Sequence, residues 1–165
     1  MKQFIQTNDG DLINLCSVSN VVFVPDWKDR FGNHKPKIIY NFDYTVSLPR
    51  SEKKVVDYKY SIFESLNKYE QEAKQLNKAI NELGWLAPII NNKIDKIINP
   101  NKISFITKDD DNLRIIINLN APVSFHMDYS RLTSDFIYLN CTDWDEYQNN
   151  LRQIMGILSM KEITQ

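Results

Sequence analysis

The stretch Ile38-Ile39-Tyr40-Asn41-Phe42-Asp43-Tyr44-Thr45-Val46-Ser47-Leu48 decides the fold, because a similar stretch recurs later in the chain. Residues 115–125 read Ile-Ile-Ile-Asn-Leu-Asn-Ala-Pro-Val-Ser-Phe, and five of the 11 positions are identical at a constant offset of 77. Self-similarity at a fixed offset is the signature of a repeated structural unit. The match therefore predicts an internal duplication.

The sequence that follows each copy also matches, at an offset of 78. Each copy precedes an apolar stripe with the spacing of one helix face. The two stripes are Leu66, Tyr69, Ala73, Leu76 and Ile80, and Trp144, Tyr147, Leu151, Ile154 and Leu158. Aromatic residues at 58 and 60 align with those at 136 and 138, and their alternation is typical of a strand that faces a core. We expect each module to end in an amphipathic helix.

The sequence before each copy aligns at a larger offset of 85, which matches Ile13-Asn14 with Ile98-Asn99 and Ser19 with Ser104. The drop from 85 to 77 means that the first module carries about eight extra residues before Ile38. The extra residues fall in the segment 24–37.

Turn and strand signals complete the expected architecture. Asn8-Asp9-Gly10 is typical of a hairpin turn, Gly84 of a helix C-cap, and Thr142 with Asp145 of a weak capping box. Strands are expected over 4–5, 12–15, 18–24, 37–48, 55–62, 96–98, 103–107, 113–119, 123–127 and 136–139, and helices from 64 to 83 and after 142. The prediction is an α+β protein made of two tandem modules, each an antiparallel sheet plus a C-terminal helix, over residues 1–84 and 94–165 with a linker at 85–93.

Composition limits the function classes. The chain has 165 residues and a formal net charge of −1, which argues against a broad nucleic-acid-binding face and against an acidic nucleic-acid mimic. It has no apolar run long enough to span a membrane and no signal-peptide pattern at its start, so we expect a cytoplasmic protein without a membrane partner. The abundance of Asn, Ile and Lys fits an AT-rich bacterial or phage genome.

The usual catalytic and metal-binding patterns are absent from the sequence. The four glycines are scattered, so there is no phosphate loop or nucleophile elbow, and Cys16 and Cys141 have no metal spacing. His126-Met127-Asp128 and Asp109-Asp110-Asp111 are best explained as turns. We therefore expect no catalytic residues, no metal and no cofactor.

The extra segment of the first module is the best candidate site. It mixes aromatic and basic residues, and Trp and Arg are the residue types that most often anchor interfaces. A second basic segment follows at 49–54. The predicted partner-binding residues are Trp27, Lys28, Arg30, Phe31, His34, Lys35, Lys37, Arg50, Lys53 and Lys54. An alternative interpretation is structural: Trp27 and Phe31 would then fold back onto the sheet.

These observations favour a non-catalytic interaction or regulatory protein that binds a macromolecular partner, with a protein favoured, through this aromatic-basic loop. One alternative is nucleic-acid binding by the same residues, with phosphates on the basic side chains and a base stacked on an aromatic ring. Another is an enzyme or small-ligand binder with a pocket between the modules, near His126, Asp128 or Tyr129. The sequence does not specify an oligomeric state.

Overall fold

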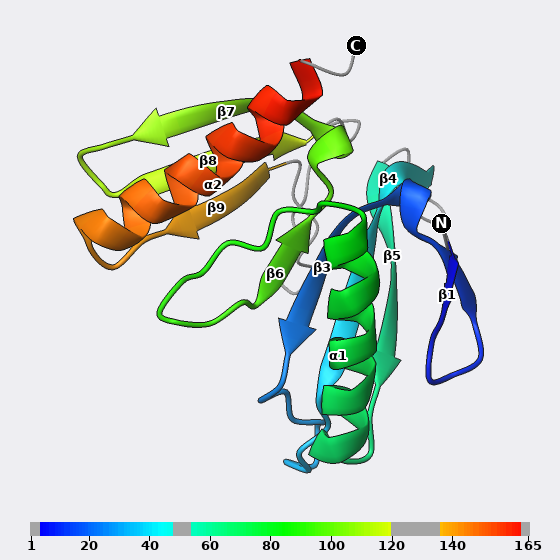
Figure 1. Cartoon of the computed structure of the whole chain (residues 1–165). Coiled ribbons are helices and arrows are strands. Elements are labelled where there is room, and N and C mark those ends of the chain that lie inside the picture. The colour runs from blue at the N-terminus through cyan, green and yellow to red at the C-terminus, as the bar shows by residue number, and fades with distance from the viewer. Residues whose placement is uncertain (1–3, 48–53, 120–135, 163–165) are drawn as a thin grey trace.

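The computed structural model describes residues 4–47, 54–119 and 136–162. It is an α+β protein of antiparallel sheets and two helices, one of them C-terminal, as the sequence predicted (Figure 1). In chain order the elements are β1 (Phe4–Gln6), β2 (Leu12–Asn14), the 3-10 turn η1 (Leu15–Ser17), β3 (Val18–Val24), β4 (Lys37–Ser47), β5 (Lys54–Ile62), α1 (Leu66–Glu82), β6 (Lys96–Ile98), the 3-10 turn η2 (Pro100–Lys102), β7 (Ile103–Asp109), β8 (Arg114–Leu119), β9 (Phe136–Asn140) and α2 (Trp144–Glu162). The strand expected over 123–127 lies outside the described residues.

The N-terminal half packs α1 against one face of the β5-β4-β3-β6 sheet, next to the small β1–β2 hairpin (Figure 1). Helix α1 begins after Ser65, whose hydroxyl accepts a hydrogen bond from the Lys68 amide at 3.4 Å, and it ends before Gly84, which adopts a positive φ of 65°. Leu76 and Ile80 of its stripe are buried against Tyr40 of β4 and other core residues. The predicted burial of Leu76 is confirmed.

The C-terminal half packs α2 against one face of the β7-β8-β9 sheet. Alternate β8 residues, Ile115 and Ile117, face the helix and are fully buried, because successive side chains of a strand point to opposite faces. Ile154, the predicted centre of the α2 stripe, is also buried there. Each half therefore has a core of its own.

Strand β6 joins the two halves. It follows the first helix in sequence, yet it pairs antiparallel with β3 and becomes the fourth strand of the N-terminal sheet. On its other side, Ile98 forms a bridge with Leu86, with both backbone hydrogen bonds at 2.8–2.9 Å. Trp85, inside the predicted 85–93 linker, is buried in the N-terminal core, whereas Leu86 is buried in the C-terminal core. The chain therefore contacts both cores over the segment that was predicted to separate the modules.

The strand registers of the two sheets correspond at the offsets seen in the sequence. Asn41 pairs with Tyr58 and Asn118 with Phe136, while Val18 pairs with Phe42 and Ile103 with Leu119. A register shift of the first pair of strands lies between Val18 and Asn20, and that of the second pair lies between Ile103 and Phe105. The two sheets thus share their pairing pattern, bulge included.

Local hydrogen bonds correspond in the same way. Asn14 and Asn99 each cap a 3-10 turn by accepting a hydrogen bond from the amide two residues later, at 3.0 Å in both cases. The Ser19 hydroxyl donates to the Asn41 carbonyl at 3.0 Å, and the Ser104 hydroxyl donates to the Asn118 carbonyl at 3.1 Å. The asparagine caps are local, whereas the serine bonds join adjacent strands, and both kinds recur at corresponding positions in the two halves.

Three expectations about side chains are wrong. The aromatic residues at 58, 60, 136 and 138 do not belong to the two cores that the helices cover: Tyr60 and Tyr138 are exposed, and Tyr58 and Phe136 are half-buried. Tyr60 pairs with Ile39, the neighbour of the core-facing Ile38 and Tyr40, so it shares the sheet face that points away from the helix. Leu66 and Trp144, the first members of the two predicted stripes, are also exposed; each is the first residue of its helix.

The predicted cap of the second helix is displaced by one residue. Asp143, not Thr142, precedes the first helical residue, and its Oδ1 accepts a hydrogen bond from the Glu146 amide at 2.8 Å. Glu146 in turn accepts from the amide and hydroxyl of Thr142, at 2.7 and 3.0 Å. Asp143 thus caps the helix, and Glu146, in place of the expected Asp145, bonds back to Thr142, one residue before the cap.

No helix in the part of the chain that the structure describes is long and apolar enough to cross a membrane.

Candidate functional site

The extra segment of the first module forms a hairpin between β3 and β4. Its two arms are held by an antiparallel bridge between Lys28 and His34, and the Lys35 amide donates to the Trp27 carbonyl at 2.9 Å. At the tip, Gly32 has a φ of 81° and its amide donates to the Asp29 carbonyl at 3.0 Å. A positive φ is readily adopted only by glycine, so Gly32 permits the tight turn.

The Asp29 carboxylate organises the tip of this hairpin. Its Oδ1 accepts hydrogen bonds from the backbone amides of Phe31 and Asn33, both at 2.9 Å, and its Oδ2 accepts one from the Asn33 side chain at 3.0 Å. These bonds favour the charged form of Asp29. Together they lower its pKa below 3.8, and the largest contribution comes from the Asn33 side chain. The tip is an ordered turn at neutral pH.

Phe31 and Arg30 project from the ordered tip. The Phe31 side chain is 74% exposed, the largest exposure among the apolar side chains that the structure describes. The Arg30 guanidinium lies over its ring, with Cζ 4.7 Å from the ring centroid. The structural alternative, in which Phe31 folds back onto the sheet, therefore does not hold for this residue, and the tip presents an aromatic ring with a cation on one face.

Trp27 lies differently from Phe31. It is half-buried, and the Lys37 ammonium nitrogen is 4.5 Å from the centroid of its ring. Burial lowers the pKa of Lys37. Trp27 and Lys37 therefore form the base of the hairpin, where they cover each other in part.

The other predicted site residues divide into three groups. Lys28, Lys35 and His34 lie on the hairpin arms, where the His34 Nε2 is 3.9 Å from the Asp26 carboxylate. Lys54 begins β5, and its backbone pairs with Ser47. Arg50 and Lys53 lie outside the described residues. The structure thus brings seven of the predicted residues together in one hairpin: Trp27, Lys28, Arg30, Phe31, His34, Lys35 and Lys37.

The second half connects the corresponding strands with a short turn. There the Asp109 carboxylate accepts hydrogen bonds from the Asn112 amide at 3.3 Å and from the Asn112 side chain, and it forms an ion pair with Arg114 at 2.5 Å. An aspartate and an asparagine therefore organise both connections, but only the first carries aromatic residues. The connection between β7 and β8 is thus much shorter than the hairpin between β3 and β4.

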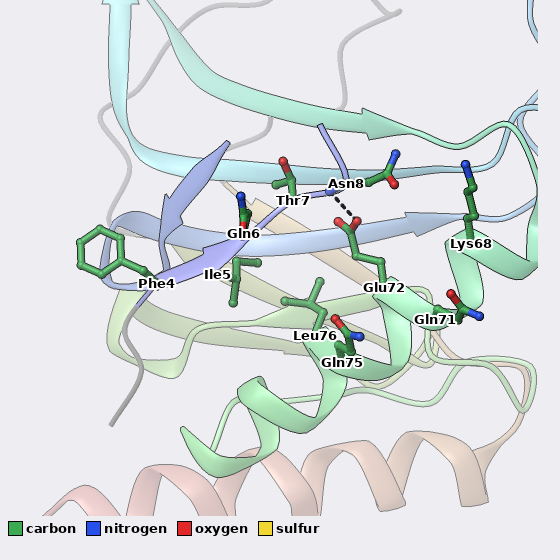
Figure 2. A pocket seen from close by; sticks show the side chains of 10 residues that line it. All are labelled: Phe4, Ile5, Gln6, Thr7, Asn8, Lys68, Gln71, Glu72, Gln75 and Leu76. Atoms are coloured by element: carbon green, nitrogen blue, oxygen red, sulfur yellow. Dashed lines mark hydrogen bonds between the residues drawn. The ribbon is translucent and has the colours of Figure 1, made fainter. Parts of the chain in front are cut away.

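The sequence analysis missed a groove between the β1–β2 hairpin and α1 (Figure 2). It has a volume of about 570 Å³ and is lined by Phe4, Ile5, Gln6, Thr7, Asn8, Lys68, Gln71, Glu72, Gln75 and Leu76. Its walls come from segments about 60 residues apart in the sequence, so no local motif could have indicated it. Cavities of this size are typical of small-ligand or peptide sites.

Glu72 is the central charged group of this groove, and it already has partners. Its Oε2 accepts from the Asn8 amide at 2.8 Å, as the dashed line in Figure 2 shows, and its Oε1 accepts from the Tyr40 hydroxyl at 3.1 Å. Burial raises the pKa of Glu72, although both hydrogen bonds oppose that shift. The Glu72 carboxyl group thus links the β1–β2 hairpin to the helix and to the sheet.

The predicted pocket near His126, Asp128 and Tyr129 lies outside the described residues. Cys16 is exposed, and Cys141 is half-buried; both are free thiols. Among the described residues, no group of three or more His, Cys, Asp and Glu side chains is arranged to hold a metal ion.

Comparison of the chain with protein-family models, with curated proteins and with solved structures finds no match.

Proposed function

We propose that this chain is a non-catalytic interaction or regulatory protein, from a bacterium or a phage, that binds a partner protein through the hairpin 24–37. The observation that carries the proposal is the exposure of Phe31 under the Arg30 guanidinium at the tip of an ordered turn. Exposing a phenylalanine ring to water is unfavourable, and a partner pocket that covers it would remove that cost. Aromatic and arginine anchors of this kind dominate the energetics of many interfaces.

The hydrogen bonds of Asp29 support the same proposal. A loop that is ordered before binding loses less conformational entropy when it binds. Asp29 fixes the amides of Phe31 and Asn33, and the Lys28–His34 bridge fixes the arms. The hairpin can therefore present Phe31 in one position at little further entropic cost.

A protein partner is favoured over a nucleic acid by the state of the basic side chains. The ring of Trp27 is half-buried and has the Lys37 ammonium over one face, so that face is not open for a base to stack on. His34 lies near Asp26, and the net charge of the whole chain is −1. The electrostatic attraction that phosphate binding needs is weak here.

We also propose that the two modules arose by duplication and that the hairpin was added to the first. The shared strand registers and the two asparagine-capped 3-10 turns support this proposal. A loop present in only one of two similar modules is a natural location for a binding function, because loops tolerate insertion and carry function disproportionately.

Site-specific photo-cross-linking tests the proposed function. A photoreactive phenylalanine analogue replaces Phe31 in one variant and Asp111, in the short turn of the second module, in the control variant. In extract of the host cell we expect a discrete protein adduct from position 31 that position 111 does not form. Equal adduct patterns from both positions would refute the proposal. Tight binding of single-stranded DNA that weakens steeply with salt would favour the nucleic-acid alternative instead.

A further inference from the structure

Strands β3 and β7 occupy corresponding places in their sheets but differ in their neighbours. β3 lies between β4 and β6, and its residues from Val18 to Phe23 are buried. Among the described residues, β7 pairs only with β8, and most of its side chains are exposed, including Phe105 at 60%. The sheet position next to β7 that corresponds to β6 therefore holds no described strand.

Strand β2 corresponds to β6, at the offset of 85 that also relates Asn14 to Asn99. β6 is paired on both sides, by β3 on one side and by Leu86 on the other. β2 is paired with β1, where Ile13 meets Ile5 as Ile98 meets Leu86. Among the described residues, no strand pairs with the other edge of β2, which is the edge that β6 uses to pair with β3, although Asp11 beside it forms an ion pair with Lys59 at 2.7 Å.

The hydrogen bonds that hold β1 confirm this correspondence. The Glu72 carboxylate accepts from the Asn8 amide, and the Asn150 carboxamide accepts from the Ile89 amide, at 2.8 and 3.0 Å. Residues 8 and 89 differ by 81, as do Ile5 and Leu86. The β1–β2 hairpin and the Leu86–Ile98 pair are thus equivalent parts of the two modules.

Equivalent apolar side chains on these two segments have opposite exposure. Ile97 of β6 is 2% exposed and Trp85 is 6% exposed, because both enter the core of the preceding module. Their counterparts, Leu12 and Phe4, are 71% and 54% exposed. Figure 2 shows the Phe4 ring pointing away from the other labelled side chains of the groove. The first module thus exposes two apolar residues whose counterparts in the second module are buried in the N-terminal core.

We propose that β2 of one copy of this chain adds to β7 of another copy, at the edge that no described strand occupies, in the way that β6 adds to β3 within the chain. The corresponding register places Ile13 opposite Phe105, Leu12 opposite Ile106, and Asp11 opposite Thr107 of the second copy. Leu12 and Phe4 would then enter the space between β7 and α2, as Ile97 and Trp85 enter the N-terminal core. A second copy is the occupant because one molecule carries both halves of the interface.

The association is head-to-tail, since the two surfaces differ. Such heterologous contacts build rings or open chains of copies, in contrast to symmetric dimers. In Figure 1 the β1–β2 hairpin and β7 lie on opposite sides of the molecule, so one copy cannot pair them with each other.

Sedimentation velocity of the purified full chain from about 1 µM to about 1 mM tests the proposal in the usual range of weak self-association. The variants are Leu12→Asp, which changes the donor edge, Phe105→Asp, which changes the acceptor edge, and Leu66→Asp as a control at an exposed helix start that tolerates acid. We expect the wild type and the control to form species beyond a dimer, and each edge variant alone to be monomeric. An equimolar mixture of the two edge variants should form a dimer and nothing larger. In that dimer β2 of Phe105→Asp pairs with β7 of Leu12→Asp, and the two remaining edges are both altered.

Three results would overturn the proposal: a monomeric wild type over the whole range, association that only one of the two edge variants abolishes, or a mixture that stays monomeric. Far-ultraviolet circular dichroism checks that the variants fold. If an aspartate variant does not fold, Leu12→Gln and Phe105→Gln take the same two places with the same expected outcomes.

Discussion

Ile97 and Ile98 are consecutive residues of β6, yet Ile97 is buried in the N-terminal core and Ile98 in the C-terminal core. The alternation of side chains along a strand makes this division possible, because neighbouring residues point to opposite sides. Three residues of one strand thereby connect two cores that are otherwise built from separate sheets and helices.

Truncation of Ile97 should consequently weaken both halves of the molecule. Ile97→Ala leaves a cavity in the N-terminal core and loosens β6, and we expect a loss of about 2–5 kcal/mol in the free energy of unfolding. Amide hydrogen exchange of β4 and β8 measures the two halves separately. We expect the free energy of exchange to fall by the same amount for the amides of both strands. A loss confined to β4 would show that the halves unfold independently.

The hairpin tip should respond to acid through Asp29. Its pKa is lowered below 3.8, so the hydrogen-bonded turn is fully formed above that pH and is lost as the pH falls through the lowered value. We expect the amide resonances of Phe31 and Asn33 to shift with one common midpoint below 3.8 in NMR spectra. Asp29→Asn keeps the shape of the side chain but removes its charge, so it should abolish that midpoint. If the two amide resonances still titrate together in this variant, another group controls the turn.

Glu72 has the opposite pH dependence. Burial raises its pKa above 4.5, so its contribution to stability is fully present below pH 4.5 and is lost as the pH rises through the raised value. Urea unfolding from pH 4.5 to about pH 7 should show a smaller loss of stability in Glu72→Gln than in the wild type. Glu70→Gln on the exposed side of α1 is the control, and an identical change in both variants would contradict the assignment to Glu72.

The sequence was sufficient for the order and type of the elements, because hydrophobic period and turn residues are local signals. It did not indicate the direction in which Tyr60 and Tyr138 point, since alternation shows which residues share a face but not which face meets the helix. The role of β6 was also out of reach: three residues carry little periodic signal, and their partner on β3 is more than 70 residues away. The seven hairpin residues became candidates because the second module lacks the segment, and their binding role stays a prediction. The orientation of Phe31 depends on hydrogen bonds at Asp29 that composition does not specify.

Replacement of residues 26–34 by a short Asn-Gly turn tests the central claim, that the hairpin is a binding surface that the fold does not require. Two quantities are measured. The first is the melting temperature of the variant. The second is the amount of the partner protein, identified by its cross-link to position 31, that the immobilised variant captures from extract. We predict a change in melting temperature of less than about 3 °C, which corresponds to about 1 kcal/mol in a chain of this size, and complete loss of the captured protein. A variant that unfolds, or that captures the protein at full affinity, would contradict the claim.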